Sequence, residues 1–138
     1  MSWLNEFSIL ARGRLAGLLA AGLVVAVIAG PSGTAWAGKA DVVGVEAVRD
    51  SDGTYRFNVT VRHHDEGWHH YANAWEVVGP DGTVLGTRVL LHPHEREQPF
   101  TRYLGKVKIP AGIQEVTIRA LDLKHGAGGK EITVEVPK

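Results

Sequence analysis

The sequence predicts an all-β fold, namely a seven-stranded antiparallel β-sandwich of the immunoglobulin or fibronectin III kind that follows an N-terminal signal peptide. Three observations lead to this prediction. Residues 54–62 alternate apolar and polar side chains with a period of two, which is the pattern of a strand buried on one face. Short β-type runs recur at spacings of roughly ten to fifteen residues, separated by turn residues. No segment after residue 37 shows the periodicity of an amphipathic helix.

The first 37 residues differ from the rest of the chain. Arg12 and Arg14 precede an uncharged apolar run at 15–29, and the segment ends in Ala35-Trp36-Ala37. A basic start, an apolar middle and an Ala-x-Ala end are the parts of a secretory signal peptide. We therefore predict cleavage after Ala37, which leaves residues 38–138 as one domain. The alternative is an uncleaved anchor, but the apolar run is short of the roughly 20 residues that span a bilayer.

The remaining chain divides into short β-type runs bounded by Gly, Pro, Asp and Ser. The run at 71–78 is apolar on both faces, as a central strand requires, and Trp75 within it is a predicted core residue. The runs at 79–82 and 110–112 contain Pro and Gly, which end strands and favour turns. The predicted strands are residues 40–48, 54–62, 71–78, 83–91, 100–109, 115–123 and 131–136.

Composition narrows the classes of function. Without residues 1–37 the chain carries 13 basic and 14 acidic side chains, and this balance gives no electrostatic reason to expect nucleic acid or an anionic membrane as a partner. There is no cysteine, which excludes disulfides, zinc–thiolate and iron–sulfur sites, and lipidation of an N-terminal cysteine. Met1 is the only methionine. The predicted mature protein therefore has no soft sulfur ligand, and Cu(I) is disfavoured.

The histidines are confined to three predicted loops. Successive antiparallel strands place alternate loops at opposite ends of a sandwich, so the loops at 63–70, 92–98 and 125–130 share one end. Those three loops hold all seven histidines, and the loops at the other end hold none. Because imidazole is the commonest metal ligand in proteins, this distribution predicts a metal site at one end of the domain.

Strand phase selects the predicted ligands. His63 continues the inward face of residues 54–62, whereas His64 points outward; His92 and His94 form a His-x-His pair; His70 and His125 lie at strand ends. The predicted metal ligands are His63, His70, His92, His94 and His125. Neighbouring side chains could orient these rings; they are His64, His69, Asp65 and Asp122. Trp68 could cover the site. Ligand chemistry favours a divalent ion such as zinc or Cu(II) as the cofactor.

These features predict an exported protein for periplasmic metal binding, delivery or sensing, with the metal ion and an envelope protein or transporter as partners. The alternatives are a non-metal accessory module of a cell-envelope complex and a histidine surface that makes pH-dependent contacts. A metalloenzyme would need a general base, for which Glu66 and Glu95 are candidates. No motif fixes that geometry, so the sequence favours a binding protein over an enzyme.

Two segments carry a resemblance. Residues 70–86, HYANAWEVVGPDGTVLG, and residues 90–102, which include Leu91-His92-Pro93-His94 and end in EQPFTR, resemble a group of small secreted, periplasmic bacterial β-sandwich proteins. The resemblance covers nearly all of residues 38–138. It implies export to the periplasm and carries no particular activity.

Overall fold

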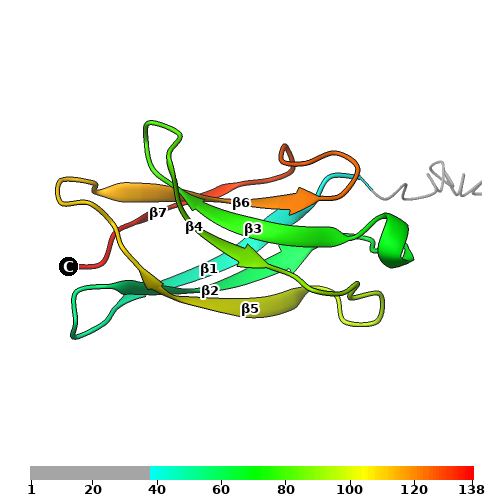
Figure 1. Ribbon diagram of the computed structural model, residues 1–138, viewed down its shortest axis with the longest axis horizontal. Helices are drawn as coiled ribbons and strands as arrows, with labels where there is room; N and C mark the ends of the chain where they lie inside the picture. Colours follow the sequence, from blue (N-terminus) through cyan, green and yellow to red (C-terminus); the bar gives the residue numbers. More distant parts are fainter. Residues whose placement is uncertain (1–37) are drawn as a thin grey trace, which may run out of the picture. The chain divides into compact units, whose positions relative to one another are not determined.

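The computed structural model describes residues 38–138, so the predicted signal peptide at residues 1–37 lies outside the described residues. In the described part of the chain, seven strands form two antiparallel sheets, and one short 3-10 turn, η1 (Gly67–His69), precedes the third strand (Figure 1). The predicted all-β class is confirmed. No helix in this part of the chain is long and apolar enough to cross a membrane.

Each observed strand overlaps a predicted one, and the ends differ by no more than two residues. The strands are β1 (Asp41–Arg49), β2 (Tyr55–Arg62), β3 (Ala72–Val78), β4 (Val84–Val89), β5 (Phe100–Val107), β6 (Glu115–Asp122) and β7 (Ile132–Glu135). The largest differences are at the C-terminal ends of β4 and β5. Leu90 there still donates its N–H to the carbonyl of Asn73, so the chain remains extended beside β3 after the regular ladder stops.

One sheet has the strand order β1-β2-β5 and the other β4-β3-β6-β7. β3 lies between β4 and β6, as its apolar sequence predicts. The inward side chains of both sheets form one core, in which Phe57 of β2, Trp75 of β3 and Ile118 of β6 are fully buried. Full burial of a side chain of this size contributes about 1.5–3 kcal/mol.

The alternation of strand direction sorts the loops between two ends of the domain (Figure 1). The η1 loop and the loops after β4 and β6 lie together at one end, which we call the histidine end. Direct contacts join these loops: the N–H of His94 is hydrogen-bonded to Asp65, and the rings of His70 and His125 lie 5.0 Å apart between centroids. The predicted gathering of the three histidine-bearing loops is therefore observed.

Candidate metal centre at the histidine end

His63 is the first residue after β2 and stays in phase with the buried residues Val59 and Val61. Its side chain is fully buried, with Nδ1 2.6 Å from Oδ1 of Asp65 and Nε2 2.9 Å from the carbonyl oxygen of Gly38. Both partners are acceptors, so this arrangement suits an imidazolium that donates two hydrogen bonds. Burial alone would lower the pKa of His63, but the hydrogen bond and negative charge of Asp65 outweigh it, and the pKa is raised.

Asp65 joins three segments of the histidine end. In addition to the His63 contact, its Oδ1 accepts the N–H of Ala72 at 3.0 Å, and its Oδ2 accepts the N–H of His94 at 2.6 Å. Burial alone would raise the pKa of Asp65, but these hydrogen bonds stabilise the carboxylate, and the pKa is lowered. The carboxylate therefore fixes the end of β2, the start of β3 and the loop at 92–98 relative to one another.

Asp122 provides a second buried carboxylate that several groups of the histidine end contact. Strand pairing sets it opposite Ala72, and its side chain is fully buried. Its Oδ1 lies 3.1 Å from Nε2 of His70 and 2.9 Å from Nδ1 of His125, and it also accepts the N–H groups of Lys124 and His125. Burial alone would raise the pKa of Asp122, but these donors outweigh it and the pKa is lowered. Oδ2 of Asp122 is buried with no hydrogen-bond partner.

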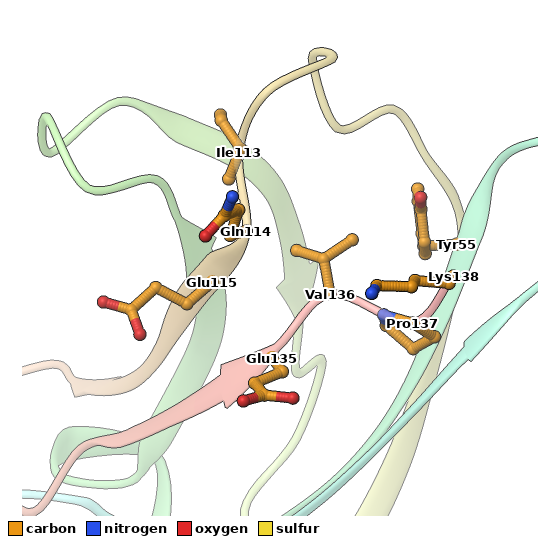
Figure 2. Close-up of a pocket in the computed structure, with 8 residues that line it drawn as sticks. All are labelled: Tyr55, Ile113, Gln114, Glu115, Glu135, Val136, Pro137 and Lys138. Atoms are coloured by element: carbon orange, nitrogen blue, oxygen red, sulfur yellow. The ribbon is translucent and has the colours of Figure 1, made fainter.

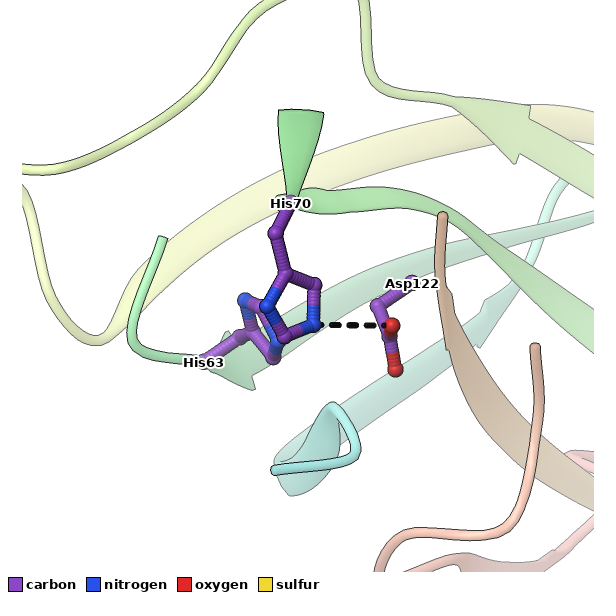
Figure 3. A group of neighbouring side chains, drawn as sticks. All are labelled: His63, His70 and Asp122. Atoms are coloured by element: carbon purple, nitrogen blue, oxygen red, sulfur yellow. Dashed lines mark hydrogen bonds and ion pairs between the residues drawn. The ribbon is translucent and has the colours of Figure 1, made fainter. Parts of the chain in front are cut away.

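His63, His70 and Asp122 converge within the described part of the chain. Each offers one ligand atom, and these atoms all lie within 4.8 Å of one another (Figure 3). The rings of His63 and His70 meet edge to face at 4.8 Å between centroids. All three residues are buried, and they come from the end of β2, the start of β3 and the end of β6. Tertiary structure thus assembles two imidazoles and a carboxylate from sites far apart in sequence.

The other two predicted ligands form a separate pair. The rings of His92 and His94 lie 4.5 Å apart, and His94 stacks on Phe100 at 4.0 Å with the two rings 12° from parallel. Nδ1 of His94 is 4.0 Å from Oδ2 of Asp65. Burial, then the positive charge of Arg102, then that of His92, lower the pKa of His94.

The structure therefore divides the five predicted ligands. His63 and His70 meet with Asp122, and His125 contacts Asp122. His92 and His94 form a separate pair beside Phe100. Asp122, predicted only as a supporting residue, lies in one group with His63 and His70. Asp122 is in phase with the buried residues Val116, Ile118 and Ala120 of the same strand, and this alternation is visible in the sequence.

The remaining predicted supporting residues differ in their positions. Asp65 is buried and lies beside His63, whereas His64 and His69 are exposed. Trp68, predicted to cover the site, is 64% exposed and packs edge-on against Tyr71. It lines an open hollow of about 490 Å³ on the side of His92 and His94.

Two residues that contact the histidines at this end were not predicted. The side chain of Gln98 accepts the N–H of His63 and donates to the carbonyl of His94, both at 3.0 Å. The carbonyl of Gly38 is the other, and neither residue type carries a sequence signal for such a role.

Another hollow, of about 450 Å³, lies at the end of the domain away from the histidines (Figure 2). Glu115, Glu135 and Lys138 contribute its charged groups, and Tyr55 forms part of its wall. None of the predicted site residues lines it. The chemistry predicted from sequence is therefore confined to the histidine end.

Comparison with known proteins places the chain near one described protein. It is 37% identical over 97 residues to a "putative lipoprotein" of Halomicrobium mukohataei; the match covers 70% of this chain and 47% of the relative. The chain thus spans about half the length of the relative that it matches. No family model matches the chain. No solved structure matches it.

Proposed function

We propose that this protein binds a divalent transition metal, zinc or Cu(II), through His63, His70 and Asp122 at the histidine end, for metal binding, delivery or sensing in the cell envelope. One observation carries the proposal: two imidazoles and a carboxylate, all buried, present ligand atoms within 4.8 Å of one another. Three protein ligands of these types are a common donor set for zinc.

Two further features support the fit of a metal ion. Oδ2 of Asp122 is a buried oxygen without a hydrogen-bond donor, and an unsatisfied buried carboxylate oxygen is unfavourable unless a cation or donor reaches it. The Asp65 carboxylate holds Nδ1 of His63, and a carboxylate on one ring nitrogen orients the other nitrogen of a metal-binding histidine. His63 would then bind through Nε2, which lies 2.9 Å from the carbonyl oxygen of Gly38.

Both ring nitrogens of His63 face hydrogen-bond acceptors, the carboxylate of Asp65 and the carbonyl oxygen of Gly38. An ion that coordinates Nε2 therefore has to replace the proton that this nitrogen donates to Gly38, and the raised pKa of His63 acts in the same direction. Metal affinity therefore falls as pH falls. His125, which already contacts Asp122 and is partly exposed, is the additional ligand that could complete the coordination.

The cellular location is part of the same proposal. The relative from Halomicrobium mukohataei is described as a lipoprotein, which supports an envelope location for this chain, and residues 1–37 have the pattern of a signal peptide. The sheet orders β1-β2-β5 and β4-β3-β6-β7 support the immunoglobulin or fibronectin III kind of sandwich.

Metal titration of protein purified without an affinity tag tests the proposal. We expect zinc and Cu(II) to bind with a stoichiometry near one, and His70→Gln and Asp122→Asn to weaken binding by about 10- to 100-fold. His64→Gln and His69→Gln are matched controls, because both residues are exposed at the same end, and we expect them to leave affinity unchanged. Equal loss in the controls, or no stoichiometric binding by the unaltered protein, would reject this site.

The second candidate function is a non-metal interaction module of an envelope complex. Trp68 and Leu91 favour it, since they are 64% and 78% exposed near the histidine end, and exposed aromatic and aliphatic side chains are typical of contact surfaces. This second function would be supported if the unaltered protein binds no metal and the His70→Gln variant still binds its envelope partner.

A further inference from the structure

A small hollow of about 100 Å³ lies between β4 and the start of β5, next to the His92–His94 pair. No carboxylate lines it. Its lining residues are Arg88, Val89, Leu90, Leu91, His92, His94 and Arg102. The polar side chains among the lining residues are therefore arginines and histidines, whereas the candidate metal centre contains the carboxylate of Asp122.

Arg88 is the unpaired cation of the hollow. It lies directly opposite Trp75 in the β3–β4 ladder, so both side chains project from the same, inward face of the sheet. Nε of Arg88 is buried with no hydrogen-bond partner. Within residues 38–138, the arginines in ion pairs are Arg56, Arg62, Arg102 and Arg119, and Arg88 is not among them. A buried guanidinium donor without an acceptor is unfavourable.

His94 brings further unpartnered atoms to the same place. Its side chain is 2% exposed, and Nδ1 and Nε2 are both buried without hydrogen-bond partners. Stacking on Phe100 fixes the plane of the ring. Since a neutral imidazole donates through one nitrogen, this ring also presents one N–H that lacks an acceptor.

Arg102 lines another side of the hollow, and its guanidinium is held in place by Glu97 and Phe100. Its two terminal nitrogens donate to the two carboxylate oxygens of Glu97 at 3.1 and 2.9 Å, and its guanidinium lies 5.5 Å from the centre of the Phe100 ring. Glu97 thus balances the charge of Arg102, and the charge of Arg88 remains unbalanced. The indole N–H of Trp75, opposite Arg88, is another buried donor with no acceptor.

We propose that this hollow binds one oxyanion group, a carboxylate or a phosphate-like anion, through Arg88 and His94. The missing partners are acceptors, because the orphaned Arg88 group is a donor and the lining supplies no carboxylate. A metal ion is disfavoured here, since two guanidinium groups would repel it. The small volume suits one anionic group, and the exposed Val89 and Leu91 at its rim can contact an apolar substituent. This site is independent of the metal centre.

Amide chemical-shift mapping tests the proposal on metal-free protein of residues 38–138 and on the full chain. The probes are inorganic phosphate, acetate and hexanoate, each added at constant ionic strength against chloride. We expect saturable shifts confined to residues 88–94 and 100–102. Stronger binding of phosphate than of the carboxylates indicates a free inorganic anion as the ligand, and stronger binding of hexanoate than of acetate indicates an organic acid. Shifts that are absent or spread over the surface with all three probes overturn the proposal.

The Arg88→Gln variant provides a second test of the anion site. We expect it to weaken anion binding about tenfold or more, because it removes a charge-assisted hydrogen bond. Arg49→Gln is the matched control, an exposed arginine on β1, and should leave affinity unchanged. Asp122→Asn should also leave anion binding unchanged, which separates failure of this site from failure of the metal centre. Undiminished binding by a folded Arg88→Gln protein overturns the proposal, and if that variant does not fold, the mapping on the unaltered protein decides.

Discussion

Nδ1 of His63 lies 2.6 Å from Oδ1 of Asp65, and both side chains are completely buried. The sequence separation of these residues is only two, yet the pair connects distant parts of the chain. The other His63 nitrogen meets Gly38, and Asp65 accepts N–H groups from Ala72 and His94. The pair therefore holds the segments of the histidine end together. It also orients the ring of His63, one of the proposed metal ligands.

The first prediction concerns Asp65→Asn. The variant keeps the shape of the side chain but leaves a buried His63 without its counter-ion. We expect the free energy of unfolding to fall by about 3–5 kcal/mol, the usual effect of breaking a buried ion pair. Chemical denaturation at pH 6 measures it.

Asp81→Asn is the control for this change. Asp81 is exposed and accepts hydrogen bonds from Thr83 in the turn after β3, and an asparagine oxygen can still accept the backbone N–H. We expect a change below about 1 kcal/mol. Equal destabilisation by both variants would show that the buried pair has no special part in stability.

The second prediction is the pH dependence of stability in metal-free protein. The lowered pKa of Asp65 means that its contribution is present above its ordinary value of 3.8 and is lost as pH falls through the folded-state pKa. The raised pKa of His63 means that its contribution is present below its ordinary value of 6.5 and is lost as pH rises through the folded-state pKa. The pair thus stabilises the fold most between about pH 4 and 6.5.

His94 has the opposite sign, because its pKa is lowered and its contribution is lost as pH falls below its ordinary value. The difference in unfolding free energy between the unaltered protein and Asp65→Asn isolates the pair from this opposing effect. We expect that difference to be largest near pH 5–6 and smaller by pH 9. Denaturation series in the presence of a chelator measure it, and a difference that is flat from pH 4 to 9 would contradict the assignment.

The third prediction separates metal binding from folding at Asp122. Asp122→Asn keeps an acceptor oxygen for the N–H groups of Lys124 and His125 but removes the negative charge. We expect zinc affinity to fall at least tenfold, while the melting temperature of metal-free protein falls by only a few degrees. Calorimetric zinc titration and thermal melts of the same samples test this. A variant with unchanged zinc affinity would show that Asp122 is not a ligand.

The fourth prediction is stabilisation by metal. A ligand that binds only the folded protein at 100 times its dissociation constant adds about 2.7 kcal/mol, and for a domain of this size that raises the melting temperature by roughly 10 °C. We expect zinc to produce this shift and a chelator to reverse it. Mg²⁺ is the matched control, because it prefers oxygen ligands in octahedral geometry and should give no shift. Equal shifts with both ions would indicate nonspecific charge screening.

Much of the fold could be predicted from the sequence because strand periodicity is local. Alternation along residues 54–62 and the Pro- and Gly-containing turns defined the strands to within two residues at each end. Antiparallel order then placed the histidine-bearing loops at one end without knowledge of strand pairing. The same local phase predicts that His63 points inward, and His63 is buried.

The composition of the site was decided only by tertiary structure. Register between β3 and β6 sets Ala72 opposite Asp122, and this brings the carboxylate to His70 from 52 residues away. The sequence marks Asp65 as one support among several, but its side chain makes hydrogen bonds to three segments, and His94 is not in the group of His63, His70 and Asp122. Distances between these side chains depend on how the two sheets pack. The periodicity of a single strand therefore cannot predict which side chains of the histidine end touch. The sequence by itself determined which end of the domain carries the chemistry, and tertiary packing determined which of its side chains meet.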